Sequence, residues 1–225
     1  MCELLLDTDV LIKLAAYGLL EAIAHPGCDP GCERRTGLIA AARFVARKQL
    51  QRKAANVEGA LANLDAFLTT AEILEPSQTE LEFAADLEDA AARAGVDLDV
   101  GESQLCALAL LQQLPVILTG DKRAIVAAEH LLGVVPAVAG LATRMACLEQ
   151  AVTLAVQRIG SLVVRALVIT ELKMDTAVTI CFHSTNPAVG DDFQPTGLAS
   201  YVNDLRRSAP TMLLPGTALT LASVP

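Results

Sequence analysis

The chain has 225 residues, of which 53% are hydrophobic and 19% are charged, and this composition excludes an intrinsically disordered protein. The formal net charge of −9 argues against indiscriminate binding to nucleic acid, and the aromatic content of 3% leaves few rings on which bases could stack. Charged residues interrupt every long apolar stretch, so we expect no secretory signal and no membrane span, but a cytoplasmic protein.

Short apolar strands alternate with helices along the first 135 residues. The pattern predicts a strand at 4–6, helices at 10–24, 36–55 and 58–69, a strand at 71–74, helices at 79–94 and 102–113, a strand at 116–118 and a helix at 123–132. Thr79 and Glu82 form a capping-box pattern, and Gly95 is a helix stop. This alternation predicts an α/β fold in which helices cover a central parallel sheet.

The pattern changes after about residue 135. Apolar residues at helical spacing predict one long helix between Leu141 and Ile159, and a small helix is predicted around residues 198–207. We therefore expect a domain of residues 1–135 and a mostly helical C-terminal extension of residues 136–225, for which the sequence indicates no role.

Four acidic side chains lie where a parallel sheet would bring them together. Asp7 and Asp9 follow the first strand, and Asp121 follows the strand at 116–118. Glu102 begins the helix that precedes this strand. Active sites of open parallel sheets form beyond the carboxyl ends of the strands. Carboxylates crowded there repel one another unless a cation neutralises them, and oxygen ligands suit Mg²⁺ or Mn²⁺. The sequence therefore predicts a divalent-metal site made by these four residues.

At these positions the chain resembles the PIN-domain nucleases, the family that includes the VapC-type toxin ribonucleases. The matching segments are LLLDTDVLIKLA at 4–15, DVGESQLCALALLQQL at 99–114 and VILTGDKRAI at 116–125. The resemblance covers about residues 1–135. It implies a PIN-like three-layer α/β/α domain that hydrolyses RNA with Mg²⁺ or Mn²⁺.

The resemblance also implies roles for individual residues. The family's catalytic acids would be Asp7, Glu102 and Asp121, and Glu33 is the best match to its further acid. Thr8 and Thr119 would be supporting residues, with the Thr119 hydroxyl steadying the first aspartate. An antitoxin-type protein partner is a further implication of the same resemblance.

Basic side chains are concentrated in residues 34–57, which contain no acid. They flank the apolar stripe of one predicted helix, so they are candidates for following an RNA backbone toward the metal, although a solvated helix face would have the same pattern. The candidates are Arg34, Arg35, Arg43, Arg47, Lys48, Arg52 and Lys53. The mean hydropathy of +0.45 suggests apolar surface covered by a partner, most simply a second copy in a homodimer.

Two alternatives remain open. The segment DTDVL also resembles the opening of haloacid-dehalogenase-type phosphatases, with Asp7 as nucleophile and Asp9 as acid and base. Lys173 would then be the lysine of such a site, and Asp191 with Asp192 its metal pair. The second alternative is a PIN-fold binding protein without turnover.

Overall fold

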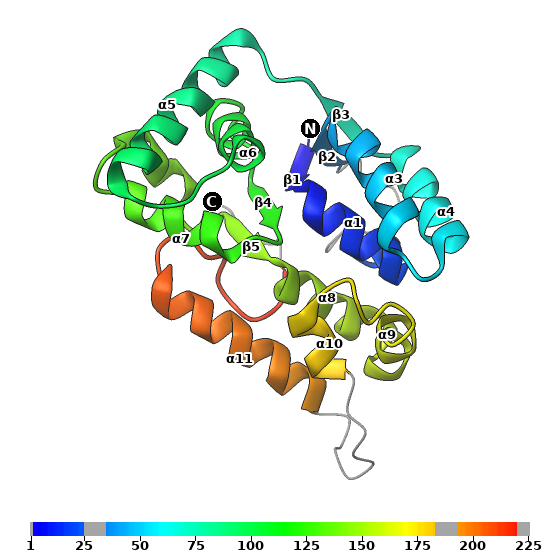
Figure 1. Cartoon of the computed structure of the whole chain (residues 1–225). Coiled ribbons are helices and arrows are strands. Elements are labelled where there is room, and N and C mark those ends of the chain that lie inside the picture. The colour runs from blue at the N-terminus through cyan, green and yellow to red at the C-terminus, as the bar shows by residue number, and fades with distance from the viewer. Residues whose placement is uncertain (1, 25–34, 183–192, 220–225) are drawn as a thin grey trace.

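The computed structural model describes residues 2–24, 35–182 and 193–219 (Figure 1). Its centre is a five-stranded sheet in which all neighbouring strands are parallel, in the order β3-β2-β1-β4-β5. The strands are β1 (Cys2–Leu6), β2 (Arg35–Ile39), β3 (Glu72–Leu74), β4 (Val116–Thr119) and β5 (Met145–Cys147). The order runs outward from β1 in both directions, so the winding of the chain reverses between β1 and β4.

Helices cover both faces of the sheet, which confirms the predicted three-layer α/β/α fold. They are α1 (Thr8–Tyr17), α2 (Leu20–Ala24), α3 (Ala42–Lys53), α4 (Val57–Leu68), α5 (Gln78–Ala94), α6 (Val100–Leu111), α7 (Lys122–Leu131), α8 (Leu148–Ile159), α9 (Ser161–Val168), α10 (Thr176–Phe182) and α11 (Phe193–Ser208). A 3₁₀ helix, η1 (Pro136–Leu141), precedes β5.

The side chains of β1 alternate between the two faces of the sheet and therefore contribute to both hydrophobic cores. Leu4 and Leu6 face the core that contains α1 to α4 and α8 to α10, whereas Leu5 faces the core that contains α5, α6 and α7. All three leucines are at most 1% exposed. Because both faces of the sheet are covered at β1, the side chains of Leu4, Leu5 and Leu6 are all buried, which is why LLL precedes the first aspartate.

Three predicted boundaries in the first half are wrong. The predicted helix at 10–24 is two helices, because Gly18 ends α1 in the left-handed conformation with φ of 69°. The predicted helix at 36–55 is the strand β2 followed by α3. The capping box of α5 is formed by Ser77 and Glu80, rather than by Thr79 and Glu82.

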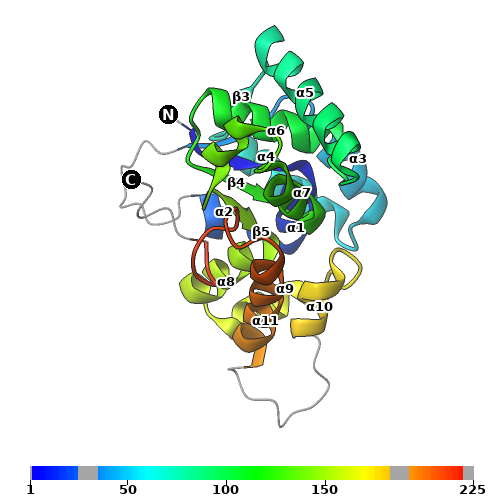
Figure 2. The ribbon, with the colours of Figure 1, turned by 90° about the vertical axis from the view of Figure 1, so that its left-hand side faces the viewer.

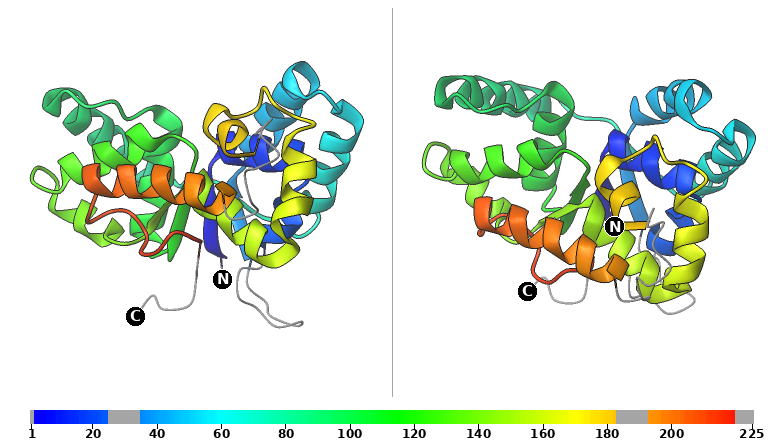
Figure 3. Two further views of the ribbon diagram at one scale, coloured as in Figure 1. Left: turned by 90° about the horizontal axis from the view of Figure 1, so that it is seen from below. Right: turned by 60° about the horizontal axis from the view of Figure 1, so that its bottom comes forward.

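The predicted long helix of the second half is also wrong, since its first part is η1 and β5. The chain past residue 135 thus adds the fifth strand to the same sheet, and the division into two domains stays a prediction. The helices α8 to α11 gather at one end of the molecule, the lower end in Figure 1, which faces the reader in Figure 3. Figure 2 shows α10 and α11 packed together there. None of the described helices has the length and apolar character needed to span a membrane.

Candidate functional site

A cleft of about 740 Å³ opens beyond the carboxyl ends of β1 and β4, where the winding of the sheet reverses. Open parallel sheets bind their ligands at such a point. Leu6 pairs with Leu118, so the residues that follow the two strands lie side by side. Five carboxylates and three cations line the cleft: Asp7, Asp9, Asp99, Glu102, Asp121, Lys13, Lys53 and Arg123.

Asp7 occupies the position before α1 where an aspartate commonly caps the helix, yet its side chain makes no capping hydrogen bond. The Thr119 hydroxyl instead donates to Asp7 Oδ2 at 3.2 Å, which is the contact that the resemblance implied. Burial, and then the negative charge of Asp9, raise the pKa of Asp7, and the Thr119 hydrogen bond offsets only part of this rise. The Asp7 carboxylate is therefore destabilised in the absence of a cation.

Glu102 closes a capping box at the start of α6. Its backbone N–H donates to Asp99 Oδ1, and its Oε2 accepts from the Asp99 N–H, both at 2.9 Å. Closing a capping box does not by itself raise the pKa of a glutamate. The pKa of Glu80, which has the equivalent position in α5, is lowered. The pKa of Glu102 is raised to about 7, first by burial and then by Asp99, Asp121 and Asp7. The capping role therefore does not account for the environment of this side chain.

Asp121 and Asp9 already have cationic partners. Asp121 Oδ1 accepts from the Arg123 backbone N–H at 2.8 Å, and the Arg123 guanidinium lies 2.6 Å from Asp121 Oδ2. This side-chain contact is the main reason that the pKa of Asp121 is lowered. Lys13 Nζ lies 2.5 Å from Asp9 Oδ2 and 2.8 Å from Asp175 Oδ2. Burial opposes the charge of Lys13, but the two aspartates raise its pKa nonetheless.

The acidic side chains share one cleft without forming a ready-made metal site. Among the residues that the structure describes, no group of three or more His, Cys, Asp or Glu side chains is arranged to hold a metal ion. Asp9 and Asp121 are instead paired with the basic side chains of Lys13 and Arg123. The donor set nevertheless fits Mg²⁺ or Mn²⁺, because the acids offer only carboxylate oxygens, and the pKa values of Asp7 and Glu102 are raised. A side chain at Gly120 would collide with the Asp9 carboxylate, so glycine keeps this edge of the cleft open.

The remaining predicted site residues are only partly brought to the cleft. Glu33 and Arg34 lie outside the described residues, and Arg35 is the first residue of β2. Lys53 of α3 lines the cleft, together with Gln49 and Val45, which lie one and two turns earlier.

The other basic residues of α3 point elsewhere. Arg47 forms an ion pair with Asp65, and the Arg43 guanidinium lies 4.7 Å from the centroid of the Phe44 ring. Lys48 and Arg52 are exposed on the same helix. Both remain available to a ligand that approaches from solvent.

Sequence reasoning missed Lys13, Arg123 and Asp99 of the cleft, and also Asp175, the second partner of Lys13. Two of these had a readable signal, because Lys13 stands four residues after Asp9 on one helix, and Asp99 stands three residues before Glu102 as in a capping box. Asp175 had none, since it reaches Lys13 only through the packing of the C-terminal helices.

The phosphatase alternative gains no support from the structure. Lys173 is exposed and does not line the cleft. Its metal pair, Asp191 and Asp192, lies outside the described residues.

Comparisons with known proteins add little. No protein family model matches the chain, and no curated protein matches it. Among solved structures, a similar chain comes from the crystal structure of VapBC2 from Rickettsia felis bound to a DNA fragment from their promoter. The two chains are 15% identical, the similarity covers 54% of this chain and 89% of that chain, and the TM-score is 0.41.

Proposed function

We propose that the chain is a metal-dependent ribonuclease of the PIN type, with Asp7, Asp9, Glu102 and Asp121 as the ligands of Mg²⁺ or Mn²⁺. The observation that carries this proposal is that Asp7, Glu102 and Asp121 line one cleft at the carboxyl ends of β1 and β4, where burial and neighbouring carboxylates raise the pKa of Asp7 and Glu102. Carboxyl groups whose charge is this unfavourable are typical of sites that are completed by a cation.

The chain's own residues supply the rest of the site. Thr119 holds the Asp7 carboxylate in place, and the capping box fixes Glu102 through Asp99. A bound divalent ion supplies the activation of a water molecule and the stabilisation of charge on the phosphate. Asp9 and Asp121 would bind the ion in place of Lys13 and Arg123. The positive charges of Lys13 and Arg123 would then be free to interact with the phosphodiester.

The substrate backbone would approach along α3. Lys53 lines the cleft and Lys48 and Arg52 are exposed on the same helix, so the helix carries positive charge toward the acids. The choice of RNA over DNA and an antitoxin-type partner follow from the resemblance, and a homodimer follows from the mean hydropathy of +0.45.

The decisive experiment is a calorimetric titration of the protein with Mn²⁺, followed by incubation with a labelled single-stranded RNA of mixed sequence. The wild type should bind Mn²⁺ and cleave the RNA. Asp7→Asn, which can still accept the Thr119 hydrogen bond, and Asp121→Asn should lose Mn²⁺ binding and lower cleavage at least about 100-fold.

Asp89→Asn is the matched control for these variants. Asp89 forms an exposed ion pair with Arg93 on α5 and does not line the cleft, so the substitution should change neither property. Mn²⁺ binding by Asp7→Asn with wild-type affinity would refute the proposed site.

One observation favours a second candidate, a PIN-fold binding protein without turnover. Asp9 and Asp121 are neutralised by Lys13 and Arg123, which is also the arrangement of a site that needs no metal. In that case the wild type itself should fail to bind Mn²⁺ while it retains affinity for RNA.

A further inference from the structure

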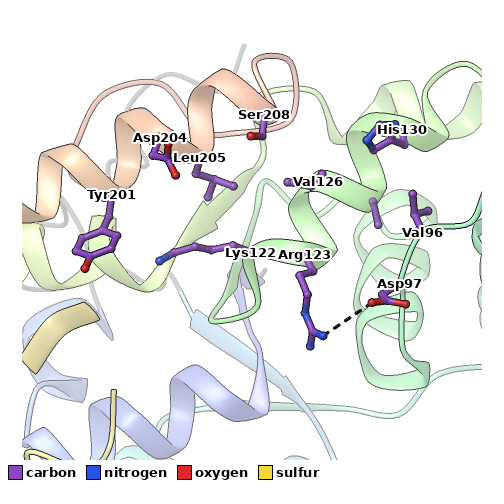
Figure 4. A pocket seen from close by; sticks show the side chains of 11 residues that line it. Val96, Asp97, Lys122, Arg123, Val126, His130, Tyr201, Asp204, Leu205 and Ser208 are labelled. Carbon is purple, nitrogen blue, oxygen red and sulfur yellow. Dashed lines mark ion pairs between the residues drawn. The ribbon is translucent and has the colours of Figure 1, made fainter. Parts of the chain in front are cut away.

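A second pocket, of about 370 Å³, lies between α7 and α11. Its middle is apolar and is formed by Val126 and Ala127 of α7 and by Leu205 of α11. Figure 4 shows Val126 and Leu205 pointing toward each other from the two helices. The volume lies within the range of about 300 to 1,000 Å³ that is typical of small-ligand sites.

One end of this α7–α11 pocket is cationic and aromatic. Lys122 and Tyr201 stand there (Figure 4), and the Lys122 ammonium lies 4.9 Å from the centroid of the Tyr201 ring. Lys122 also forms an ion pair with Glu149, which is 2% exposed, so a buried carboxylate fixes the position of the ammonium. The contacts hold a positive charge beside an aromatic ring in the lining of the pocket.

The α7–α11 pocket adjoins the carboxylate cleft. Arg123 lines both cavities, and one loop contributes Asp97 to the pocket and Asp99 to the cleft. The Arg123 guanidinium, which contacts Asp121, lies 3.9 Å from Asp97 on its other side. A ligand that fills both cavities would therefore pass the Arg123 guanidinium.

We propose that the α7–α11 pocket is a substrate subsite that binds the base of a nucleotide next to the phosphodiester in the carboxylate cleft, an inference that rests on the proposed function. The pocket calls for a ligand with a flat apolar part and an attached anionic part. Every unit of a single-stranded RNA has both, and its bases are free to leave the stack. The base would lie between Val126 and Leu205, with its phosphate toward Lys122 and Arg123. The C-terminal extension then has a role, because it supplies Tyr201 and Leu205.

The test is saturation-transfer NMR on the full chain in EDTA, with the four ribonucleoside 5′-monophosphates as probes. Their base protons should receive saturation from the protein, whereas ribose 5-phosphate, which lacks a base, should receive none. Val126→Phe, which fills the pocket, and Tyr201→Leu, which removes the ring, should each weaken binding at least fivefold. Circular dichroism on heating shows whether both variants are folded.

Val163→Phe is the matched control. It makes the same change at a residue of α9 that is 49% exposed and lies outside the pocket, so binding should be unchanged. The subsite is overturned if no mononucleotide binds, or if folded Val126→Phe and Tyr201→Leu bind as the wild type does.

Failure of the subsite and failure of the proposed function give different results. In EDTA, Asp7→Asn should bind mononucleotides as the wild type does. If the wild type neither cleaves RNA nor binds Mn²⁺, but the mononucleotide results are as expected, the ribonuclease proposal is refuted and the pocket is a nucleotide site. Metal-dependent cleavage that is unaffected by Tyr201→Leu in both KM and kcat would refute the subsite and leave the ribonuclease.

Discussion

Replacement of Glu102 by glutamine should stabilise the protein at neutral pH. Glutamine can still close the capping box with Asp99, so the substitution removes a charge without removing the local hydrogen bonds. The pKa of Glu102 rises from the ordinary value of 4.5 to about 7 in the folded chain, mainly because of burial. The folded chain therefore keeps a proton that the unfolded chain has lost, and the stability of the wild type falls as the pH rises from 4.5 to 7.

The size of this effect follows from the same pKa. A fully shielded carboxyl with this pKa would destabilise the folded state by about 3 kcal/mol above pH 7. Glu102 is 9% exposed and borders an open cleft, so solvent reduces the effect to about 1 to 2 kcal/mol. Glu102→Gln should be more stable than the wild type by that amount at pH 8, and the two should be equal near pH 4.5.

The assay is urea denaturation followed by far-UV circular dichroism in EDTA, between pH 5 and pH 8. Glu80→Gln is the control, because Glu80 has the same place in the capping box of α5. Hydrogen bonds from Ser77 and Gln112 outweigh burial and lower the pKa of Glu80. Glu80→Gln should therefore destabilise the protein above pH 4.5, because it removes a carboxylate that the folded chain stabilises. A Glu102→Gln variant that is no more stable than the wild type at pH 8 would refute this account of the cleft.

Further expectations concern the cleft and its surroundings. Below pH 7 the affinity for Mn²⁺ should increase as the pH is raised, by up to about tenfold per pH unit, because Glu102 must lose its proton to bind the ion. Calorimetry at several pH values tests this. Lys13→Met should strengthen Mn²⁺ binding, because it removes a cation that competes for Asp9, and unchanged or weaker binding would contradict the pairing. Glu171→Ala should lower the free energy of unfolding by about 2 to 4 kcal/mol in urea, because this buried carboxylate accepts two backbone N–H groups of the α3–α4 turn. Lys48→Glu should weaken RNA binding and flatten its salt dependence, and an unchanged slope would place the RNA elsewhere.

The strands β1 and β4 and the acids that follow them were readable in the sequence. Each strand contains a run of three apolar residues, at 4–6 and 116–118, and an aspartate follows each strand, at Asp7 and Asp121. A parallel sheet buried on both faces requires such runs, and its loops must be polar because their backbone groups face solvent. The parallel architecture then implied that the acids meet at one edge.

Other elements were not readable, because two structures were equally compatible with the same local pattern. Ser77 and Thr79 are each followed three residues later by a glutamate, and the box that forms is the one whose Glu80 also accepts a hydrogen bond from Gln112, which is distant in the sequence. The strand β5 has three residues, too few to show a period, and it is a strand because Met145 pairs with Ile117 of β4. Helix propensity favoured a helix there, and the sheet edge overrode it.

The sequence by itself determined the parallel α/β fold and the acids that could meet, since apolar runs and polar strand ends are local properties of the chain. Only the tertiary structure decided how deeply those acids are buried and which distant side chains hold the neighbouring cations. Lys13 reaches Asp175, and Lys122 reaches Glu149 and Tyr201, across contacts between helices that are distant in the sequence. Electrostatic interactions depend on distance and burial in the folded chain, so the charge state of this cleft is fixed by packing rather than by order along the sequence.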